Sequence, residues 1–445
     1  MKTGRDAALD SLTACRKLDA WSDGSLKAAC RGLDRREAAL AARLAYGVLQ
    51  NRALLDFYLG QYCSQPFPKL EPFVRDVLRL GAYQILFLDR VPDSAAVSEA
   101  VRMVKDRRRQ RAAGFVNAVL RKLSREKERL PALPAEGAAA ALSLRYSHPQ
   151  WLVERLLELL GREEAEEFLR LDNAGVPTTI QLHPLTCTPE ELTGRLAASG
   201  AEAAPHPWMP QCWELRGGGA LEDLPAFQAG AFQVQDAAAK AAVLAAGAEP
   251  GARVLDVCAA PGGKSFAAAM AMEDRGEVVS CDIHPHKLAL IEKGARRLGL
   301  RSIRTALADG REPRGEWQDA FDLVVCDVPC SGMGVIRKKP DVRYKDPGRL
   351  SGLPRTQGAI LENASRYVRP GGVLLYATCT ILPEENQGVT EAFLSRHPDF
   401  TREAFTLPGR EEENDGSLTL WPQRHGTDGF YICRMRKSCW QTYGP

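Results

Sequence analysis

The fold of the larger part of this chain is decided by one stretch, Val254-Leu255-Asp256-Val257-Cys258-Ala259-Ala260-Pro261-Gly262-Gly263-Lys264. Residues 254–257 have the composition of a buried strand, a glycine-containing turn follows, and a helical pattern begins near Lys264. This order is typical of an α/β sheet that binds a nucleotide or nucleoside, because glycine lets the backbone approach a ligand closely. The stretch therefore predicts a ligand site at the end of this strand.

Apolar strands alternate with helical patterns from about residue 232 onward. The predicted strands lie at 254–257, 278–283, 303–308, 322–328 and 373–378, with a late strand near 430–436. This alternation predicts a parallel sheet with helices on both faces. We expect residues 231–437 to form a Rossmann-like α/β domain.

The first part of the chain has the period of a helix instead. Apolar residues recur at i, i+3 and i+4 along 74–85 and 116–123, while Arg121 and Lys122 point away from the second stripe. This periodicity therefore predicts an all-α bundle over residues 1–135. A stretch rich in proline and alanine, 130–137, is typical of a linker.

A small α+β module is predicted between these two domains, at 145–230. It would contain a helix from about Pro149 to Arg170 and a second from Pro189 to Ser199. Residues 178–182 and 213–215 alternate like strands. The whole chain thus predicts a multidomain protein.

Bulk composition excludes several classes. The 445 residues carry a net charge of +3, and the 12 cysteines contain no CxxC pair, so neither a disulfide framework nor a zinc site is expected. The first residues lack an apolar signal core, and no stretch has the length of a membrane span. We expect a cytoplasmic protein without a resident metal.

Local charge is more informative than net charge. Residues 101–129 hold eleven Lys or Arg and three acids, and the run Arg107-Arg108-Arg109 lies at their centre. Such a patch favours contact with a nucleic acid, although a solvated helix face is the alternative. A second basic segment, 335–349, contains Arg337, Lys338, Lys339 and Arg343, and the same two interpretations apply to it.

Three acids follow successive predicted strands, namely Asp282, Asp309 and Asp327. One aspartate at a strand end is usually a helix cap or turn former, but three at one sheet edge favour a nucleoside-bearing ligand. The motifs GxxxxGK[ST] and GxGxxG, which bind phosphates, are both absent. S-adenosylmethionine therefore fits this edge better than ATP or NAD.

Two cysteines stand at the same expected edge. Cys330 lies in Asp327-Val328-Pro329-Cys330-Ser331-Gly332 and Cys379 lies in Tyr376-Ala377-Thr378-Cys379-Thr380. A free cysteine is most often a small apolar filler, and we expect this of most of the others.

Methylation of cytosine at carbon 5 needs a nucleophile for carbon 6, a base for the carbon 5 proton and a group that holds the ring edge. Cys379 and Cys330 could supply the first two. Asp327 could hydrogen-bond the cytosine edge or activate the ring by giving it a proton. Lys264 could help to keep a thiol ionised.

These motifs resemble the RsmB/Sun family of bacterial 16S rRNA cytosine-C5 methyltransferases, which belongs to the Sun/Nol/Nop group. The segments that match are 232–236, 254–264, 281–283, 326–344, 371–386 and 427–430. The helical part is similar to the NusB RNA-binding domain at 43–49 and 114–121. The resemblance covers nearly the whole chain.

The resemblance implies a role for each matching residue. Cys379 would be the nucleophile, Cys330 the thiol that helps to release product, and Asp327 an active-site acid near the cofactor. Residues 258–264 would form the S-adenosylmethionine loop, with Asp282 at the ribose and Asp309 at the adenine. The resemblance also implies an RNA-binding role for the small module. We expect a monomer that acts on 16S rRNA.

Two features depart from the family pattern, and two other functions stay open. Val328 stands where alanine is common, and Ser331-Gly332-Met333-Gly334 replaces Ser-Ala-Thr-Gly. A DNA cytosine methyltransferase would use Cys330 as its nucleophile, but the expected Glu-Asn-Val motif is absent. An RNA-binding assembly factor with an inactive methyltransferase fold is the other alternative.

Overall fold

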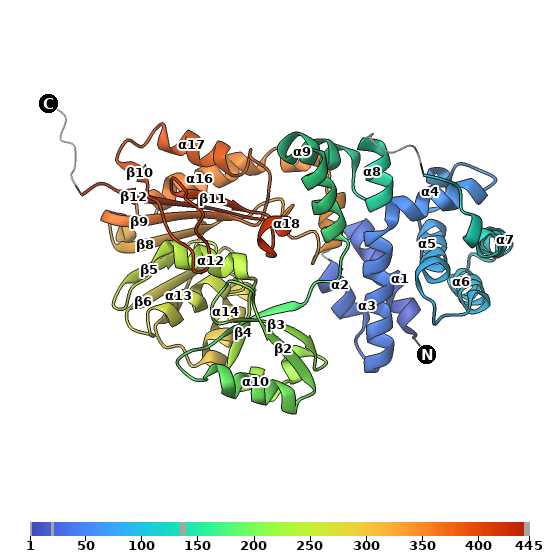
Figure 1. The fold of residues 1–445 in the computed structure, drawn as a ribbon, viewed down its shortest axis with the longest axis horizontal. Coiled ribbons are helices and arrows are strands. Elements are labelled where there is room, and N and C mark those ends of the chain that lie inside the picture. Colours follow the sequence, from blue (N-terminus) through green and yellow to red (C-terminus); the bar gives the residue numbers. More distant parts are fainter. Residues whose placement is uncertain (1, 19–21, 134–138, 440–445) are drawn as a thin grey trace. The chain divides into compact units, whose positions relative to one another are not determined.

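The computed structural model describes residues 2–18, 22–133 and 139–439, so positions 134–137 of the expected linker lie outside it. The chain forms two compact units (Figure 1). The first comprises residues 1–174 together with 336–345, and the second comprises 175–335 and 346–445.

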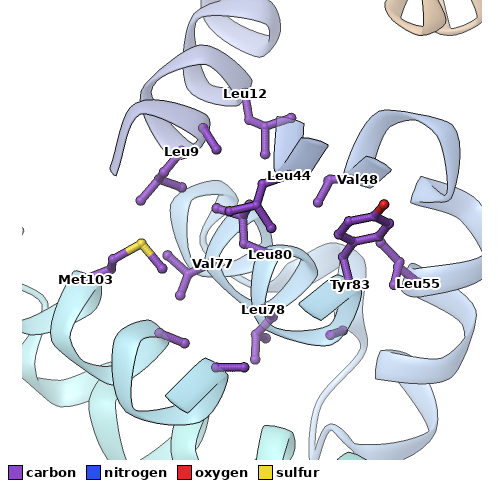
Figure 2. Close-up of a cluster of buried hydrophobic side chains, with 14 of the residues drawn as sticks. Leu9, Leu12, Leu44, Val48, Leu55, Val77, Leu78, Leu80, Tyr83 and Met103 are labelled. Atoms are coloured by element: carbon purple, nitrogen blue, oxygen red, sulfur yellow. The ribbon is translucent and has the colours of Figure 1, made fainter. Parts of the chain in front are cut away.

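The first unit is helical. Its helices are α1 (Gly4–Leu18), α2 (Ser22–Ala29), α3 (Arg35–Gln50), α4 (Arg52–Tyr62), α5 (Pro72–Phe87), α6 (Asp93–Asp106), α7 (Gln110–Glu126), α8 (Ala139–Tyr146) and α9 (Gln150–Asp172). Helix α5 is buried along most of its length, and Figure 2 shows its Val77, Leu78 and Leu80 among side chains of neighbouring helices. The all-α fold predicted for this part is confirmed.

Helix α7 shows why the sequence predicts a bundle. Val116, Val119, Leu120 and Leu123 are buried, whereas Arg121 and Lys122 are exposed. At about 25 cal/mol per Å² of apolar surface, burial of such a stripe is the main favourable term that holds a helix in place.

The segment 336–345 groups with the helical unit, although it follows β8 of the other unit in sequence. Its short 3-10 helix Pro340–Tyr344 carries Arg343, which is fully buried. The Arg343 guanidinium donates to Asn173 Oδ1 at 2.9 Å and to the carbonyl oxygens of Ser147 at 3.2 Å and Gln50 at 3.3 Å. These acceptors lie at helix C-termini, where carbonyl groups lack partners within the helix and attract a cation.

The second unit begins with a four-stranded antiparallel sheet in the order β2-β3-β1-β4. Its strands are β1 (Thr178–Leu182), β2 (Ala201–Pro205), β3 (Cys212–Gly217) and β4 (Phe232–Val234), and α10 (Pro189–Ala198) and α11 (Pro225–Gln228) accompany them. The predicted strands at 178–182 and 213–215 are present. Helix α9, which the predicted module also includes, groups by its contacts with the helical unit, and the bounds of the module stay a prediction.

The larger sheet has the order β10-β12-β9-β8-β5-β6-β7, with β11 paired to β12. Its strands are β5 (Arg253–Asp256), β6 (Glu277–Asp282), β7 (Ile303–Leu307), β8 (Phe321–Asp327), β9 (Val368–Thr378), β10 (Phe400–Arg402), β11 (Ser417–Leu420) and β12 (Phe430–Lys437). Neighbouring strands from β7 to β9 are parallel, as predicted. Strand β12 is antiparallel to β9, β10 and β11, so the sheet is mixed. The connection from β11 to β12 is too short for the crossover that a parallel pair needs, which explains the antiparallel pairing of these two strands.

Helices cover both faces of this sheet (Figure 1). Helices α12 (Ala237–Ala246), α13 (Gly263–Ala271) and α14 (Pro285–Leu298) lie on one face, and α16 (Leu353–Ser365) and α17 (Gln387–Leu394) lie on the other. Alternate residues of β8 supply the two cores, since Leu323 and Val325 face one and Val324 and Cys326 the other. The α/β class of this domain is confirmed.

In the part of the chain that the structure describes, no helix is both long and apolar enough to cross a membrane. The same residues contain no group of three or more His, Cys, Asp or Glu arranged to hold a metal ion.

Replacement of Arg343 tests its role in the helical unit. Arg343→Met should lower the free energy of unfolding of that unit by about 3 kcal/mol, because buried carbonyl groups lose their donor. Urea denaturation followed by circular dichroism measures the loss. Arg349→Met, an exposed arginine close by in sequence, should change stability by less than about 0.5 kcal/mol. Equal effects of the two substitutions would contradict the assignment.

Candidate active site

The carboxyl ends of four parallel strands bring the predicted ligand residues to one sheet edge. The turn 258–262 follows β5, Asp282 ends β6, Asp309 follows β7 and Asp327 ends β8. Because β5 lies between β6 and β8, the glycine turn has an acid on either side. Such an edge is the usual ligand crevice of an open α/β sheet.

The turn is held close to the sheet by its own backbone. The Ala259 N–H donates to the Cys281 carbonyl oxygen at 2.7 Å, and the Gly262 N–H donates to the Ala259 carbonyl oxygen at 2.7 Å. Gly262 has φ +110°, a conformation that favours glycine, and it caps α13. The first helical residues, Gly263 and Lys264, thus lie directly beside the ligand edge. Burial raises the pKa of Cys258 well above its usual value, so this thiol stays protonated.

A buried hydroxyl chain ties the strands below the turn to α13. The Ser265 hydroxyl donates to Asp256 Oδ2 at 2.7 Å, and Ser280 lies 2.8 Å from Ser265. All three residues are buried. Burial raises the pKa of Asp256 to about 7, although the hydrogen bond from Ser265 opposes the shift. This chain therefore links β5, β6 and the helix that carries Lys264.

The acids at the edge differ in their partners. Asp282 is mostly buried and accepts the His284 N–H at 2.9 Å. Asp309 makes a 2.5 Å ion pair with Arg311, and the hydrogen bond from this arginine lowers the pKa of Asp309. Both carboxylates follow their strands, as the sequence predicts.

Lys264 forms a 2.6 Å ion pair with Asp327. Burial works to lower the pKa of Lys264, but the charge and the hydrogen bond of Asp327, together with the charge of Asp256, outweigh it and the pKa is raised. The charge of Cys379 acts in the same direction. Lys264 is thus a fixed cation between the cofactor edge and the cysteine that follows β9.

The two cysteines meet at the ends of adjacent strands. In β8 and β9, Asp327 pairs with Ala377, so the loops that follow the two strands begin side by side. The Cys330 Sγ lies 3.2 Å from the Cys379 Sγ, and both residues are half-buried. The sequence placed both thiols at this edge, and the structure brings them into direct contact.

Hydrogen bonds join the two loops next to the sulfurs. The hydroxyls of Ser331 and Thr380, each one residue past its cysteine, lie 2.7 Å apart and are fully buried. The Gly334 N–H donates to the Cys379 carbonyl oxygen at 3.0 Å. Gly334 also lies against the backbone of Gly429, where a Cβ atom would clash.

The two sulfurs are not electrically equivalent. The hydrogen bond to Cys379, together with burial and the negative charge nearby, raises the pKa of Cys330 well above its usual value. The raised pKa keeps the Cys330 thiol protonated, and Cys379 lies within the electrostatic reach of Lys264. The arrangement provides one thiol and one sulfur suited to nucleophilic attack.

The carboxylates at this edge of the sheet fit S-adenosylmethionine. Asp282 and Asp309 can accept from ribose hydroxyls and from the adenine amino group. Carboxylates are unfavourable neighbours for a polyphosphate, and Lys264, at the start of α13, is already paired with Asp327. A cofactor without phosphates and with a positive sulfonium is therefore the better match.

The basic residues predicted to contact RNA lie in different surroundings. Arg107, Arg108 and Arg109 form the turn between α6 and α7, where Arg107 pairs with Asp10 at 2.6 Å and Arg109 with Glu71 at 2.6 Å. Residues 337–339 are half-buried.

Arg343 does not match its expected role. Its guanidinium is fully buried against carbonyl groups of the helical unit, which argues against a phosphate contact. We therefore no longer propose Arg343 as an RNA contact.

Sequence reasoning missed three buried polar residues beside the cysteines, Gln357, Glu385 and Asn386. Glu385 and Asn386 stand six and seven residues after Cys379, in the segment Pro383-Glu384-Glu385-Asn386. That cluster of polar residues within a buried loop was the available signal. Gln357 lies in α16 and has no local signal at all.

Comparison with known proteins identifies the family. Residues 242–436 match the family described as 16S rRNA methyltransferase RsmB/F, and residues 2–125 match the NusB family. Residues 148–222 match the RsmF/B-like ferredoxin-like domain. A Bacillus subtilis (strain 168) protein described as a probable ribosomal RNA small subunit methyltransferase B is 37% identical, over 97% of this chain and 98% of the relative. The chain belongs to the RsmB/F family of 16S rRNA methyltransferases.

Other relatives agree. The corresponding protein of Erwinia tasmaniensis, described as ribosomal RNA small subunit methyltransferase B, is 32% identical over 93% of each chain. The crystal structure of PH0851 superimposes with a TM-score of 0.84 at 26% identity, covering 98% of both chains. The structure of NSun6 from Pyrococcus horikoshii with SFG has a TM-score of 0.59 at 21% identity, covers 66% of this chain and 99% of that chain, and supports the fold alone. The predicted family is confirmed, and S-adenosylmethionine is the cofactor.

Mild oxidation tests the contact between the two sulfurs. A disulfide bond is about 2.0 Å long, so closure from 3.2 Å needs a shift of only about 1 Å. Diamide should join Cys330 to Cys379, with a linked peptide seen by non-reducing mass spectrometry and lost on treatment with dithiothreitol. The Cys330→Ser variant should give no such peptide. Absence of the link in the unsubstituted protein would contradict the geometry.

Proposed function

We propose that this protein methylates carbon 5 of a cytosine in 16S rRNA through a covalent intermediate between Cys379 and the base. S-adenosylmethionine supplies the methyl group as an electrophilic carbon on a sulfonium. In this proposal Cys379 is the nucleophile, Cys330 removes the carbon 5 proton, and Asp327 holds the pyrimidine edge. The 3.2 Å pair of sulfurs at the cofactor edge is the observation that carries it.

The unequal protonation of the sulfurs supports this assignment of roles. Cys379 attacks carbon 6, and its electron pair forms the new carbon–sulfur bond. The electrons of the 5,6 double bond are then available at carbon 5, which accepts the methyl group. A reversed assignment, as in a DNA cytosine methyltransferase, would require attack by Cys330, the thiol that its surroundings keep protonated. The raised pKa of Cys330 is therefore consistent with Cys379 as the nucleophile.

Formation of the adduct changes the protonation of Cys330. Once the Cys379 sulfur is bonded to carbon, it carries no charge and no longer holds the Cys330 proton as strongly. Two causes that raise the pKa of Cys330, the hydrogen bond to Cys379 and the charge of Cys379, then weaken together. Cys330 can then lose its proton to water at the stage when the proton on carbon 5 must be removed.

Product release completes the cycle. The ionised Cys330 takes the carbon 5 proton, the electrons of that C–H bond restore the 5,6 double bond, and the Cys379 sulfur leaves as a thiolate. Lys264 and Cys379 interact electrostatically. The positive charge of Lys264 would therefore stabilise the Cys379 thiolate both when it attacks and when it leaves. The target base must be unstacked to enter such a site.

The basic residues outside the catalytic pair would position the RNA. We propose phosphate contacts at Arg107, Arg108 and Arg109 and at 337–339, because clustered Lys and Arg bind a nucleic acid backbone without reading its sequence. The acid partners of Arg107 and Arg109 would be exchanged for phosphate groups on binding.

Replacement of each cysteine tests the roles. Cys379→Ala should lower methyl transfer to a 16S rRNA transcript by at least about 10⁴-fold, because the nucleophile is lost. Cys330→Ala should also lose turnover but should accumulate a methylated protein–RNA adduct, because attack proceeds while release is blocked. Transfer of labelled methyl groups and denaturing gel electrophoresis measure the two effects.

The exposed Cys439 provides the control. Cys439→Ala should keep full turnover and form no stable adduct. If Cys379→Ala accumulated the adduct and Cys330→Ala did not, the two roles would be reversed. If methyl transfer occurred on duplex DNA and not on the transcript, the proposed substrate would be wrong.

A further inference from the structure

The backbone on both sides of Cys330 is held by two buried side chains. The Ser331 N–H donates to Glu385 Oε2 at 2.9 Å, and Gln357 Nε2 donates to the Pro329 carbonyl oxygen at 3.0 Å. Gln357 Nε2 also donates to Glu385 Oε2 at 2.8 Å, which joins the two supports. The residues before and after Cys330 are thus fixed by one hydrogen-bonded pair.

The neighbouring residue holds the other cysteine in the same way. The Thr378 hydroxyl donates to Asn386 Oδ1 at 2.6 Å, and Asn386 Nδ2 donates to the Thr380 carbonyl oxygen at 3.0 Å. Thr378 and Thr380 flank Cys379. Two consecutive residues, Glu385 and Asn386, therefore support one cysteine each.

These supports are shielded from water. Gln357 is 0% exposed, Asn386 1% and Glu385 2%. The Tyr376 hydroxyl donates to the Glu385 carbonyl oxygen at 2.6 Å, which anchors this loop to β9. In the low dielectric of the interior, such hydrogen bonds are stronger and their geometry is better defined than at the surface.

The hydrogen-bonded pair of Glu385 and Gln357 would be an unfavourable choice if its only role were to stabilise the fold. Glu385 Oε1 and Gln357 Oε1 are buried without a hydrogen-bond partner among the described residues. An unsatisfied buried carboxylate oxygen is unfavourable, and an apolar pair of the same volume would avoid that cost. A buried acid retained next to a reacting thiol therefore indicates a functional role.

We infer that Glu385, with Gln357, is a positioning residue for the release step at Cys330, and that Asn386 is a positioning residue for the attack step at Cys379. The inference rests on the proposed function, because it assigns the two supports to the two chemical steps. Neither residue has to touch the RNA or the cofactor.

Geometry and charge both point to this division. Glu385 acts on the Pro329–Ser331 backbone, which sets where the Cys330 sulfur stands relative to carbon 5. Its negative charge also adds to the hydrogen bond with Cys379 and to burial in raising the pKa of Cys330. Asn386 carries no charge, and its two hydrogen bonds both go to residues adjacent to Cys379.

Single-turnover measurements with two RNA substrates separate the two steps. One substrate is an ordinary 16S rRNA transcript. The other is the same transcript made with 5-fluorocytidine, which reports attack and methyl transfer but not release, because fluorine cannot leave carbon 5 as a proton does. The variants are Glu385→Gln, Gln357→Leu and Asn386→Ala, compared with the unsubstituted protein.

We expect opposite results for the two supports. Glu385→Gln and Gln357→Leu should trap 5-fluorocytidine RNA within about threefold of the normal rate, but should release ordinary RNA roughly 10- to 100-fold more slowly and accumulate the adduct. Asn386→Ala should trap 5-fluorocytidine RNA roughly 10- to 100-fold more slowly and accumulate no adduct on ordinary RNA.

A buried residue of the same region controls for general loss of packing. Ser365, in the same helix as Gln357, is 3% exposed, and its hydroxyl donates to the Glu362 carbonyl oxygen at 2.8 Å. Ser365→Ala should leave both steps unchanged even if it lowers the melting temperature. The melting temperature of each variant is measured so that kinetic effects are compared among folded proteins.

The outcomes distinguish the inference from the proposed function. If the unsubstituted protein fails to trap 5-fluorocytidine RNA, the covalent mechanism itself is wrong. If it traps the RNA but Glu385→Gln and Asn386→Ala slow attack and release equally, or leave both at normal rates, the division of roles is overturned while the covalent mechanism stands.

Discussion

The parallel pairing of β8 with β9 is the constraint on which the rest of the site depends. These strands carry the two cysteines just past their carboxyl ends, and the register of Asp327 with Ala377 starts both loops at the same level. The hydroxyl pair of Ser331 and Thr380 then keeps the loops together. The same two strands supply alternate residues to the cores on both faces, so the position of the sulfurs is tied to the stability of the whole sheet.

The charges around the two sulfurs affect how each of them can react. The contact with Cys379 and burial, together with the acids nearby, raise the pKa of Cys330 above that of a thiol in water. Lys264, held by Asp327, places positive charge near Cys379. In the proposed mechanism, these surroundings let the pair divide the work of attack and proton removal.

Much of the architecture was predictable because local patterns decide it. The helical stripe at Val116 and Leu120, the strand at 254–257 and the glycine turn were predicted from residues adjacent in sequence. The mixed edge at β12 was not predicted, because a strand carries no local mark of its direction. The burial of Arg343 was not predictable either. A basic residue in a polar loop has the same local sequence pattern whether its side chain contacts solvent or the buried end of a helix.

The amino-acid sequence alone determined the class of fold, the cofactor edge and the two cysteines at that edge, because motif spacing and strand periodicity are local properties. Only the tertiary structure decided that the sulfurs touch, that the pKa of Cys330 is raised, and that Gln357, Glu385 and Asn386 hold the backbones beside them. These features depend on distance and burial between segments far apart in the chain, and such quantities exist only after the strands have paired and water has been excluded.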